Sequence, residues 1–458
     1  RAAGITPVRP RLQPAVAALL GLAYSFAFLE LPLGSLGGVK LTTTELCLAL
    51  LLAGALLYLG KGFFALDRIA VGLGAIVVSM IITTIFIGDD RGAAVKFILR
   101  FFAGVMLYLA VKRLFAQRRM VLTALRAMTA AAICFSIIGL VQSIWPELLD
   151  PLLKLWIPNK FAVYDPAAPL SFTTGNFLTA NGYVIRAASV FGYCNTFSYF
   201  LVMAIGAALL LLFTDDDRYW RQAAAFALPL HLCALALTFS RGAWLALAGG
   251  ILIGLAVYLW RGKSAHKLLV GLSGGLVVVL IGASILFMRQ PNGAPVERRS
   301  EEECRPLIMT DVAHGGDESV QTRLLLWRAA WRLGKTSPLV GVGVDRFRYR
   351  YHEALPASNF DLYLGQGLYQ PHNIVLTALA NQGIIGLLAL AALAIFILQV
   401  WWARVREGVD PPLAVVTGMT AAIGAANLYD AMMFDAYAHM LTIVLTLALL
   451  TTRGWRNE

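Results

Sequence analysis

The polar interval from Met288 to Gly383 divides this 458-residue chain. It begins MRQPNGAPVERRSEEECRP (residues 288–306), ends YQPHNIVLTALANQG (residues 369–383), and has apolar segments on both sides. His372 stands close to the point where the interval re-enters an apolar segment. We therefore expect this histidine at an interface between lipid headgroups and water, where we place the chemistry.

The composition is that of a membrane protein. Hydrophobic residues make up 59% of the chain and charged residues only 14%, with a mean hydropathy of +0.71, whereas soluble domains carry about 25% charged residues. The net charge of +12 would suggest nucleic acid in a soluble protein. In a membrane protein it indicates Lys and Arg retained on the cytoplasmic side, so we expect membrane lipids and no nucleic acid as partners.

Apolar runs near the ~20 residues that a helix needs to cross a bilayer recur along the chain. They predict an all-α integral membrane protein with about twelve transmembrane helices, the first retained because no A-x-A-like cleavage pattern follows it. The expected spans are roughly 14–33, 42–59, 69–88, 93–112, 121–144, 195–214, 222–239, 243–260, 267–287, 384–403, 412–429 and 436–451.

The cations of the short loops predict the orientation. With twelve spans, the cation-rich connections all fall on one side, which we expect to be cytoplasmic together with both termini. They include Lys61, Arg68, Lys112, Arg113, Arg118, Arg119, Arg218, Arg221, Arg261, Lys263, Arg404, Arg406, Arg453 and Arg456.

Three parts follow from this topology. Residues 1–287 hold helices 1–9 and an extracytoplasmic loop at 145–194, whose prolines argue against another span. Residues 288–383 form a large extracytoplasmic loop between helices 9 and 10, and residues 384–458 hold helices 10–12.

The large loop contains one amphipathic helix. From Thr322 to Leu333 the apolar Leu324, Trp327 and Trp331 share one helical face and Arg328 and Arg332 another. This pattern is typical of a helix on the membrane surface or against the bundle. The following Gly341-Val342-Gly343 is interpreted as a turn, because it lacks the third glycine and the preceding strand of a dinucleotide fingerprint.

Three arginines are expected on the extracytoplasmic side, where orientation alone predicts few cations. Arg186 precedes helix 6, Arg241 stands in a tight turn between two apolar runs, and Arg323 begins the amphipathic helix. Arginine suits a phosphate because its planar fork donates two hydrogen bonds and keeps its charge. The alternative is that each arginine pairs with a lipid headgroup or with a loop carboxylate such as Asp317 or Asp345.

His372 is the preferred general base. His231 and His439 lie in apolar helices and His266 in a cytoplasmic loop, where structural roles are expected. An imidazole titrates near neutrality and can take a proton from a sugar hydroxyl. The five cysteines form no CxxC pair, and no metal-binding or nucleophile-elbow motif is present. The sequence therefore predicts catalysis without a metal or cofactor.

An ordered set of motifs resembles the superfamily of bacterial O-antigen ligases and O-antigen polymerases over about residues 180–395. The set is Arg186 with Phe191 to Asn195, then Ser240-Arg241-Gly242, Gln321 to Arg323 with Trp327, Pro338 to Gly343, and His372-Asn373 with Gly383 and Gly386. Twelve helices with the large periplasmic loop between helices 9 and 10 resemble the ligase branch. Gln382, where many relatives have an acid, and Val344-Asp345 after the glycines depart from the pattern.

The resemblance implies an inner-membrane glycosyltransferase. Undecaprenyl-diphosphate-linked O-antigen would be the donor and lipid A-core the acceptor, with the diphosphate held by Arg241, Arg323 and Arg186. His372 would activate the acceptor hydroxyl, and direct attack would invert the anomeric centre.

Three alternatives remain open. An O-antigen polymerase or a protein O-oligosaccharyltransferase of the same superfamily would use another acceptor. A twelve-helix transporter predicts ionisable residues at mid-membrane and two similar halves. Here the polar signals gather on one side and the halves differ in loop length, so transport is the least favoured.

Overall fold

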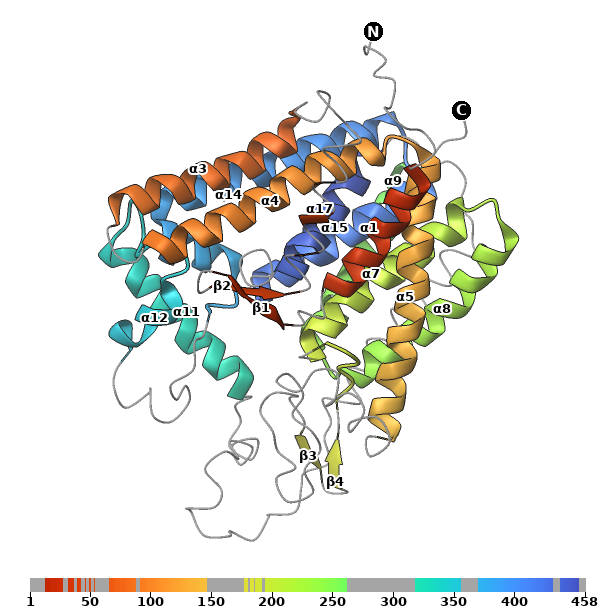
Figure 1. Cartoon of the computed structure of the whole chain (residues 1–458), viewed down its shortest axis with the longest axis horizontal. Helices are drawn as coiled ribbons and strands as arrows, with labels where there is room; N and C mark the ends of the chain where they lie inside the picture. Colours follow the sequence, from red (N-terminus) through yellow and green to blue (C-terminus); the bar gives the residue numbers. More distant parts are fainter. Residues whose placement is uncertain are drawn as a thin grey trace.

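The computed structural model describes residues 13–27, 32–36, 39–42, 46, 49–50, 53, 66–87, 91–145, 177–179, 182–184, 186–191, 194–261, 318–355, 370–430 and 437–452. Within these residues the chain is predominantly helical (Figure 1). Residues 262–317 lie outside this set, and so does the expected span at 267–287.

Ten of the expected spans coincide with helices. These are α1 (Gln13–Ala27), α3 (Arg68–Phe86), α4 (Arg91–Leu114), α5 (Arg118–Ile144), α7 (Cys194–Thr214), α8 (Arg218–Leu237), α9 (Arg241–Arg261), α14 (Ile374–Glu407), α15 (Pro411–Asp430) and α17 (Tyr437–Thr451).

Seven helices among the described residues are long and apolar enough to cross a membrane: α3, α4, α5, α7, α9, α14 and α15. Two apolar stretches, Pro14–Ser25 and Thr442–Thr451, are shorter. The expected span at 42–59 lies mostly outside the described residues. A multi-pass membrane protein is thus supported, and the total of twelve helices stays a prediction.

Two short hairpins accompany the helices, which the all-α expectation did not include. Strands β1 (Pro32–Leu36) and β2 (Val39–Thr42) pair antiparallel, as do β3 (Phe177–Thr179) and β4 (Gly182–Val184). The first expected span, 14–33, therefore ends early, because α1 stops at Ala27 and β1 begins at Pro32.

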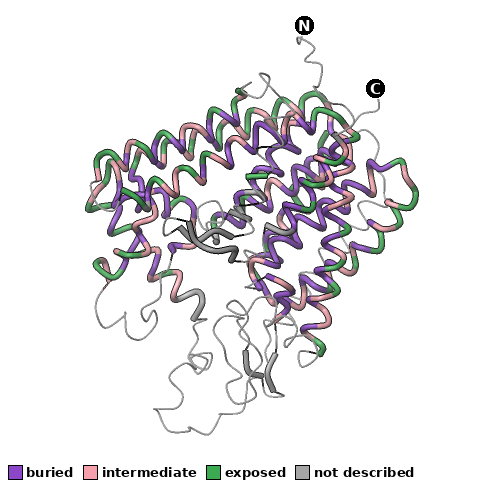
Figure 2. Tube along the Cα trace, in the orientation of Figure 1, coloured by how far each residue is buried: buried purple, intermediate pink, exposed green. Residues whose placement is uncertain are grey.

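The centre of the bundle is α7. In its apolar window 78% of the residues are buried, against 22% in α14, and buried residues concentrate on the inner helices (Figure 2). Phe191 stacks on Phe197 and also packs against Phe135 and Phe200. On α14, the exposed Ile384, Leu388, Ile395 and Leu398 follow helical spacing, so they form a stripe suited to lipid.

Small residues let α9 and α15 approach closely. A Cβ added to Gly250 would lie 2.5 Å from the carbonyl oxygen of Gly418, and one added to Gly254 would lie 2.6 Å from that of Ala414. Because lipid tails are as apolar as leucine, close packing of this kind drives helix association in membranes.

Contacts between helix ends sort these ends into two groups. Arg118 at the start of α5 bonds to Asp216 after α7, Lys112 near the end of α4 pairs with Asp67 before α3, and Arg404 near the end of α14 donates to the carbonyl of Thr452. We call this the basic end. The opposite end collects the C-terminal turns of α5, α8 and α15 and the N-terminal turns of α9 and α14.

The large loop supplies helix α11 (Glu318–Thr336), followed by α12 (Phe347–Arg350) and a 3₁₀ turn, η4 (Tyr351–Ala354). Of the two positions expected for the apolar face of α11, on the membrane surface or against the bundle, the structure does not show the second. Leu324 and Trp331 are 44% and 52% exposed, whereas the side chains that pack are Leu326, Ala329, Ala330 and Leu333. Alanines make this packed face less conspicuous in the sequence than the tryptophans.

Helix α14 begins ten residues before the expected span at 384–403, because Asn373 caps it. The Asn373 side chain accepts hydrogen bonds from the N–H groups of Val375 and Leu376. The helix then kinks at Gly383, whose φ of 63° and ψ of −150° are not helical. The boundary at 383 therefore falls on a kink within one long element.

Candidate functional site

Arg186 is positioned by the turn between α8 and α9. Its Nε donates to the Thr238 carbonyl at 2.6 Å, and its Nη2 donates to Asn195 Oδ1 at 3.1 Å. The neighbouring Ala187 N–H donates to the Leu237 carbonyl at 2.8 Å. Both of these acceptors are neutral oxygens, and together they orient the guanidinium.

Arg241 is the first residue of α9 and is exposed. The turn before it is held by the Ser240 N–H, which donates to Thr238 Oγ1, and by the Trp244 Nε1–H, which donates to the Leu235 carbonyl. Since Arg186 binds the same turn, the structure brings Arg186 and Arg241 to one place at the opposite end.

The segment that carries Arg186 is also fixed from α5. The Gln142 side-chain oxygen accepts hydrogen bonds from the Ala188 and Ser189 N–H groups at 3.0 and 2.8 Å. Ser189 Oγ donates to the Phe135 carbonyl at 2.7 Å. A buried glutamine near the end of a spanning helix thus holds the arginine segment, which the sequence did not reveal because the partners lie 46 and 47 positions apart.

His372 lies immediately before the capping residue of α14 and is half-buried. Its neighbour Asn373 donates through Nδ2 to the Leu428 carbonyl in the last turn of α15 at 2.9 Å. On its other side, Gln370 Nε2 donates to Asp345 Oδ1 at 3.0 Å, and Asp345 forms a salt bridge with Arg348 at 2.7 Å. The backbone on both sides of the histidine is therefore tied to other elements.

The glycine-containing turn packs against the kink in α14. The Val342 and Gly343 N–H groups donate to the Ala380 and Asn381 carbonyls, and the Ile384 N–H donates to the Pro338 carbonyl. A Cβ added to Gly341 would lie 2.4 Å from the backbone nitrogen of Gln382. Gly341 is needed because two backbones touch there, in agreement with the interpretation of the GxG as a turn.

Arg323 is half-buried on α11, which packs onto the first part of α14 through a cluster that includes Leu326, Ala330 and Ala380. Gln382, one of the two departures from the family pattern, is buried and accepts a hydrogen bond from Ser79 Oγ of α3 at 2.6 Å. His372 and Arg323 are thus positioned through α14, whereas Arg186 and Arg241 are positioned through the turn between α8 and α9.

Strained backbone conformations lie at or near most of the candidate site residues. Among the described residues, the non-glycine residues with positive φ are Ser189 (53°), Phe239 (50°), Asp345 (58°) and His372 (51°). Each either is a candidate site residue or lies within three residues of one, except Asp345, which binds Gln370. Residues in such conformations cost about 1–3 kcal/mol each and cluster at functional sites.

The described residues contain no group of three or more His, Cys, Asp or Glu side chains that could hold a metal ion. Their polar groups at the opposite end are guanidinium donors, which suit a bound anion, and one imidazole, which suits proton transfer. A phosphate-containing substrate fits this set of donors.

Comparison with known proteins gives one family match. The model of the O-antigen ligase family matches residues 224–391, which include Arg241, Arg323 and His372. No curated protein matches the chain. The family match supports membership of the chain in the O-antigen ligase and polymerase superfamily.

Proposed function

We propose, from the match of residues 224–391 to the O-antigen ligase family, that this membrane protein is an O-antigen ligase. It transfers O-antigen polysaccharide from undecaprenyl diphosphate to lipid A-core and so completes lipopolysaccharide. The family match supports the class of function. The arginine pair at the turn between α8 and α9 supports a diphosphate-linked donor.

The proposal includes a topology. The protein lies in the bacterial inner membrane with about twelve helices and both termini in the cytoplasm. The basic end then faces the cytoplasm, and the opposite end, with Arg186, Arg241 and His372, faces the periplasm. The polar interval at 288–383, whose last ten residues belong to α14, covers the periplasmic side between helices 9 and 10.

The arginines bind the donor diphosphate. Arg186 is held by Thr238 and Asn195 and stands beside the turn that presents Arg241. Arg323 adds a third guanidinium from α11. Positioned cations stabilise the negative charge that grows on the leaving group, a role that a metal ion has in other transferases, so the proposed reaction uses no cofactor.

His372 is the general base. A hydroxyl of the outer-core sugar attacks the anomeric carbon as the imidazole takes the hydroxyl proton. The bond between the anomeric carbon and the phosphate oxygen breaks, and undecaprenyl diphosphate leaves with the electron pair. Direct displacement inverts the configuration at the anomeric centre.

An O-antigen polymerase and a protein O-oligosaccharyltransferase would use the same donor chemistry and differ in the acceptor. Purified full-length protein in detergent with a chelator, given undecaprenyl-diphosphate-linked glycan, should be offered lipid A-core, unlinked O-unit donor and a serine-containing peptide. Product on lipid A-core supports the ligase. Chain growth on the lipid carrier, or product on the peptide, overturns the acceptor assignment.

The donor clamp has a separate test. Arg241→Ala should raise the donor KM or lower kcat by about tenfold or more, since hydrogen bonds to charged groups contribute about 1.5–3 kcal/mol each. Arg406→Ala at the basic end is the matched control and should leave both constants unchanged. Equal behaviour of the two variants would remove Arg241 from the clamp.

A further inference from the structure

A second arginine cluster surrounds a cavity at the basic end, away from the proposed catalytic site. The cavity has a volume of about 330 Å³. Most of its wall comes from α5, with Pro14 of α1 and Asp216 completing it, and the α5 residues are Arg118, Arg119, Leu122, Thr123 and Arg126. This volume lies at the lower end of the range of about 300–1,000 Å³ for ligand pockets. Neither the proposed reaction nor the family match accounts for it.

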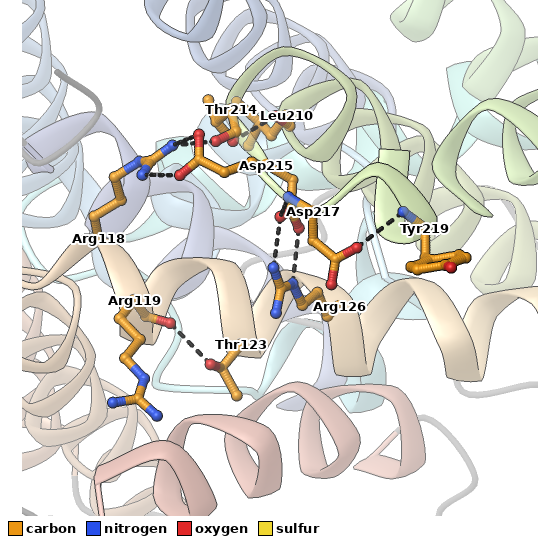
Figure 3. A network of polar contacts seen from close by, with 10 residues as sticks. Arg118, Arg119, Thr123, Arg126, Leu210, Thr214, Asp215, Asp217 and Tyr219 are labelled. Carbon is orange, nitrogen blue, oxygen red and sulfur yellow. Dashed lines mark hydrogen bonds and ion pairs between the residues drawn. The ribbon is translucent and has the colours of Figure 1, made fainter. Parts of the chain in front are cut away.

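Two of the three arginines are already paired. Arg118 donates through both terminal nitrogens to Asp216, at 2.6 and 3.0 Å, and also to the Thr214 carbonyl. Arg126 donates to the buried Asp215 at 2.7 and 2.5 Å. Figure 3 shows Arg118 and Arg126 on α5 with both guanidinium groups turned toward the segment between α7 and α8. The pairs hold the cavity wall rigid and leave little net charge of their own.

Arg119 differs from both. Its side chain is exposed, and among the described residues it makes no hydrogen bond or ion pair; only its backbone carbonyl is bonded, by Thr123 Oγ1. In Figure 3 its guanidinium points away from the aspartates. The cavity therefore carries one guanidinium that the two aspartates do not pair. Its wall includes Arg118 and Arg119 in the first turn of α5, where the helix dipole favours an anion.

The position of the cavity along α5, relative to the bilayer, indicates the source of that anion. Helix α5 has 27 residues, which corresponds to about 40 Å at about 1.5 Å per residue. A bilayer is about 40–45 Å thick including its headgroups, so the first turn of a spanning α5 lies in the headgroup layer. Pro14 and Leu122 add apolar wall beside the charges, as a glycerol backbone and the start of an acyl chain require.

We propose that this cavity binds the phosphate of an anionic phospholipid from the leaflet at the basic end, with Arg119 as its main ligand. The bound headgroup contacts α1 and α5 and lies next to the segment between α7 and α8. A single lipid therefore links three elements of the bundle.

The test uses the full-length protein, delipidated in detergent and titrated with phosphatidylglycerol, with bound lipid counted by native mass spectrometry. Arg119→Gln should weaken the tightest lipid by about fivefold, since a cation near an anionic membrane surface contributes about 1 kcal/mol. Arg406→Gln removes an exposed arginine from the same end outside the cavity and should leave this affinity unchanged. Because Arg119 is exposed, both variants should unfold at the wild-type temperature.

Two further titrations distinguish an anionic lipid from other phosphate-containing ligands. Phosphatidylcholine, which has a phosphate but no net charge, should bind the wild type and Arg119→Gln equally weakly. Millimolar inorganic phosphate should not displace phosphatidylglycerol. Unchanged affinity in Arg119→Gln, or equal loss in Arg406→Gln, would overturn the site, and displacement by inorganic phosphate would overturn the lipid as its ligand.

Discussion

The two ends of the helix bundle use their arginines in different ways. At the basic end, Arg118 and Arg126 bond to the carboxylates of Asp216 and Asp215. At the opposite end, the hydrogen bonds described for Arg186 go to a carbonyl and an amide oxygen. The carboxylate pairs at the basic end bind α5 to the segment between α7 and α8 and suit stability. The carbonyl and amide contacts of Arg186 orient its guanidinium at the turn that carries Arg241.

The backbone shows the same contrast. The positive-φ residues Ser189, Phe239 and His372 lie at the opposite end, and none of the described non-glycine residues at the basic end has this conformation. Strain persists only where the surrounding structure imposes it. The difference indicates that the opposite end is built for positioning at some cost in stability.

The strongest test of this contrast is His372→Asn. Asparagine tolerates positive φ but cannot act as a base, so transfer should fall by about 10²–10⁴-fold with unchanged folding. His352→Asn in η4 is the matched control and should retain activity. Rates from purified protein with lipid-linked donor measure both variants, and normal transfer by His372→Asn would dismiss this histidine as the base.

Next in size is Gly341→Ala. The φ of 68° and the 2.4 Å approach to the backbone of Gln382 should together cost roughly 3 kcal/mol, combining left-handed strain with overpacking. Gly74→Ala is the control because an added Cβ there meets nothing within 4 Å. Thermal unfolding in detergent compares them, and similar midpoints would contradict the close packing of the turn on α14.

A smaller effect is expected at the basic end from Asp215→Asn. The Asp215 carboxylate is fully buried, while the Arg126 side chain is 29% exposed. Removing one partner of a buried pair costs about 3–5 kcal/mol, which we reduce to about 2 because Arg126 reaches solvent.

Asp216→Asn is the control for Asp215→Asn, since the Asp216 side chain is 74% exposed. Its unfolding midpoint should stay close to that of the wild type. Transfer per folded molecule should be normal in both variants. A loss of catalysis in Asp215→Asn without a loss of stability would break the division of roles between the two ends.

The smallest expected effect is the change of stability at acid pH. The hydrogen bond from Arg118 holds the pKa of Asp216 below its ordinary value, and that from Arg350 does the same for the pKa of Glu353. A lowered pKa in the folded state contributes stability above the unfolded pKa, and this stability is lost as pH falls through the folded pKa. The small difference in unfolding midpoint from the wild type that is expected for Asp216→Asn, and the one expected for Glu353→Gln, should therefore disappear below about pH 4. A difference that persists there would argue against these ion pairs as the cause.

Sequence periodicity predicted most of the helices and some of the site. Ten expected spans coincide with helices because a run of apolar residues has few alternatives to a helix in lipid. The sequence pattern left open where the apolar face of α11 lies, and in the structure Leu326, Ala329 and Ala330 pack while Trp331 stays exposed. Periodicity finds an amphipathic pattern but not the partner that each face meets.

The expected span at 384–403 missed the first ten residues of α14 for a similar reason. Asn381 and Gln382 are polar, so the hydrophobic pattern places the start of the span after them. In the structure Asn381 Oδ1 accepts from the Phe347 N–H and Gln382 accepts from Ser79. Their partners lie 34 and 303 positions away, which a local pattern cannot show.

Hydrophobic length and the placement of cations were enough to define a membrane protein with a basic end, because both act locally along the chain. The candidate residues Arg186, Arg241, Arg323 and His372 could also be chosen from motifs. Tertiary structure alone decided that Arg186 joins the turn of Arg241 and that His372 is held between α15 and Asp345. Such contacts depend on the close packing of helices far apart in sequence, where backbones meet at glycines and each buried polar group has to find a partner.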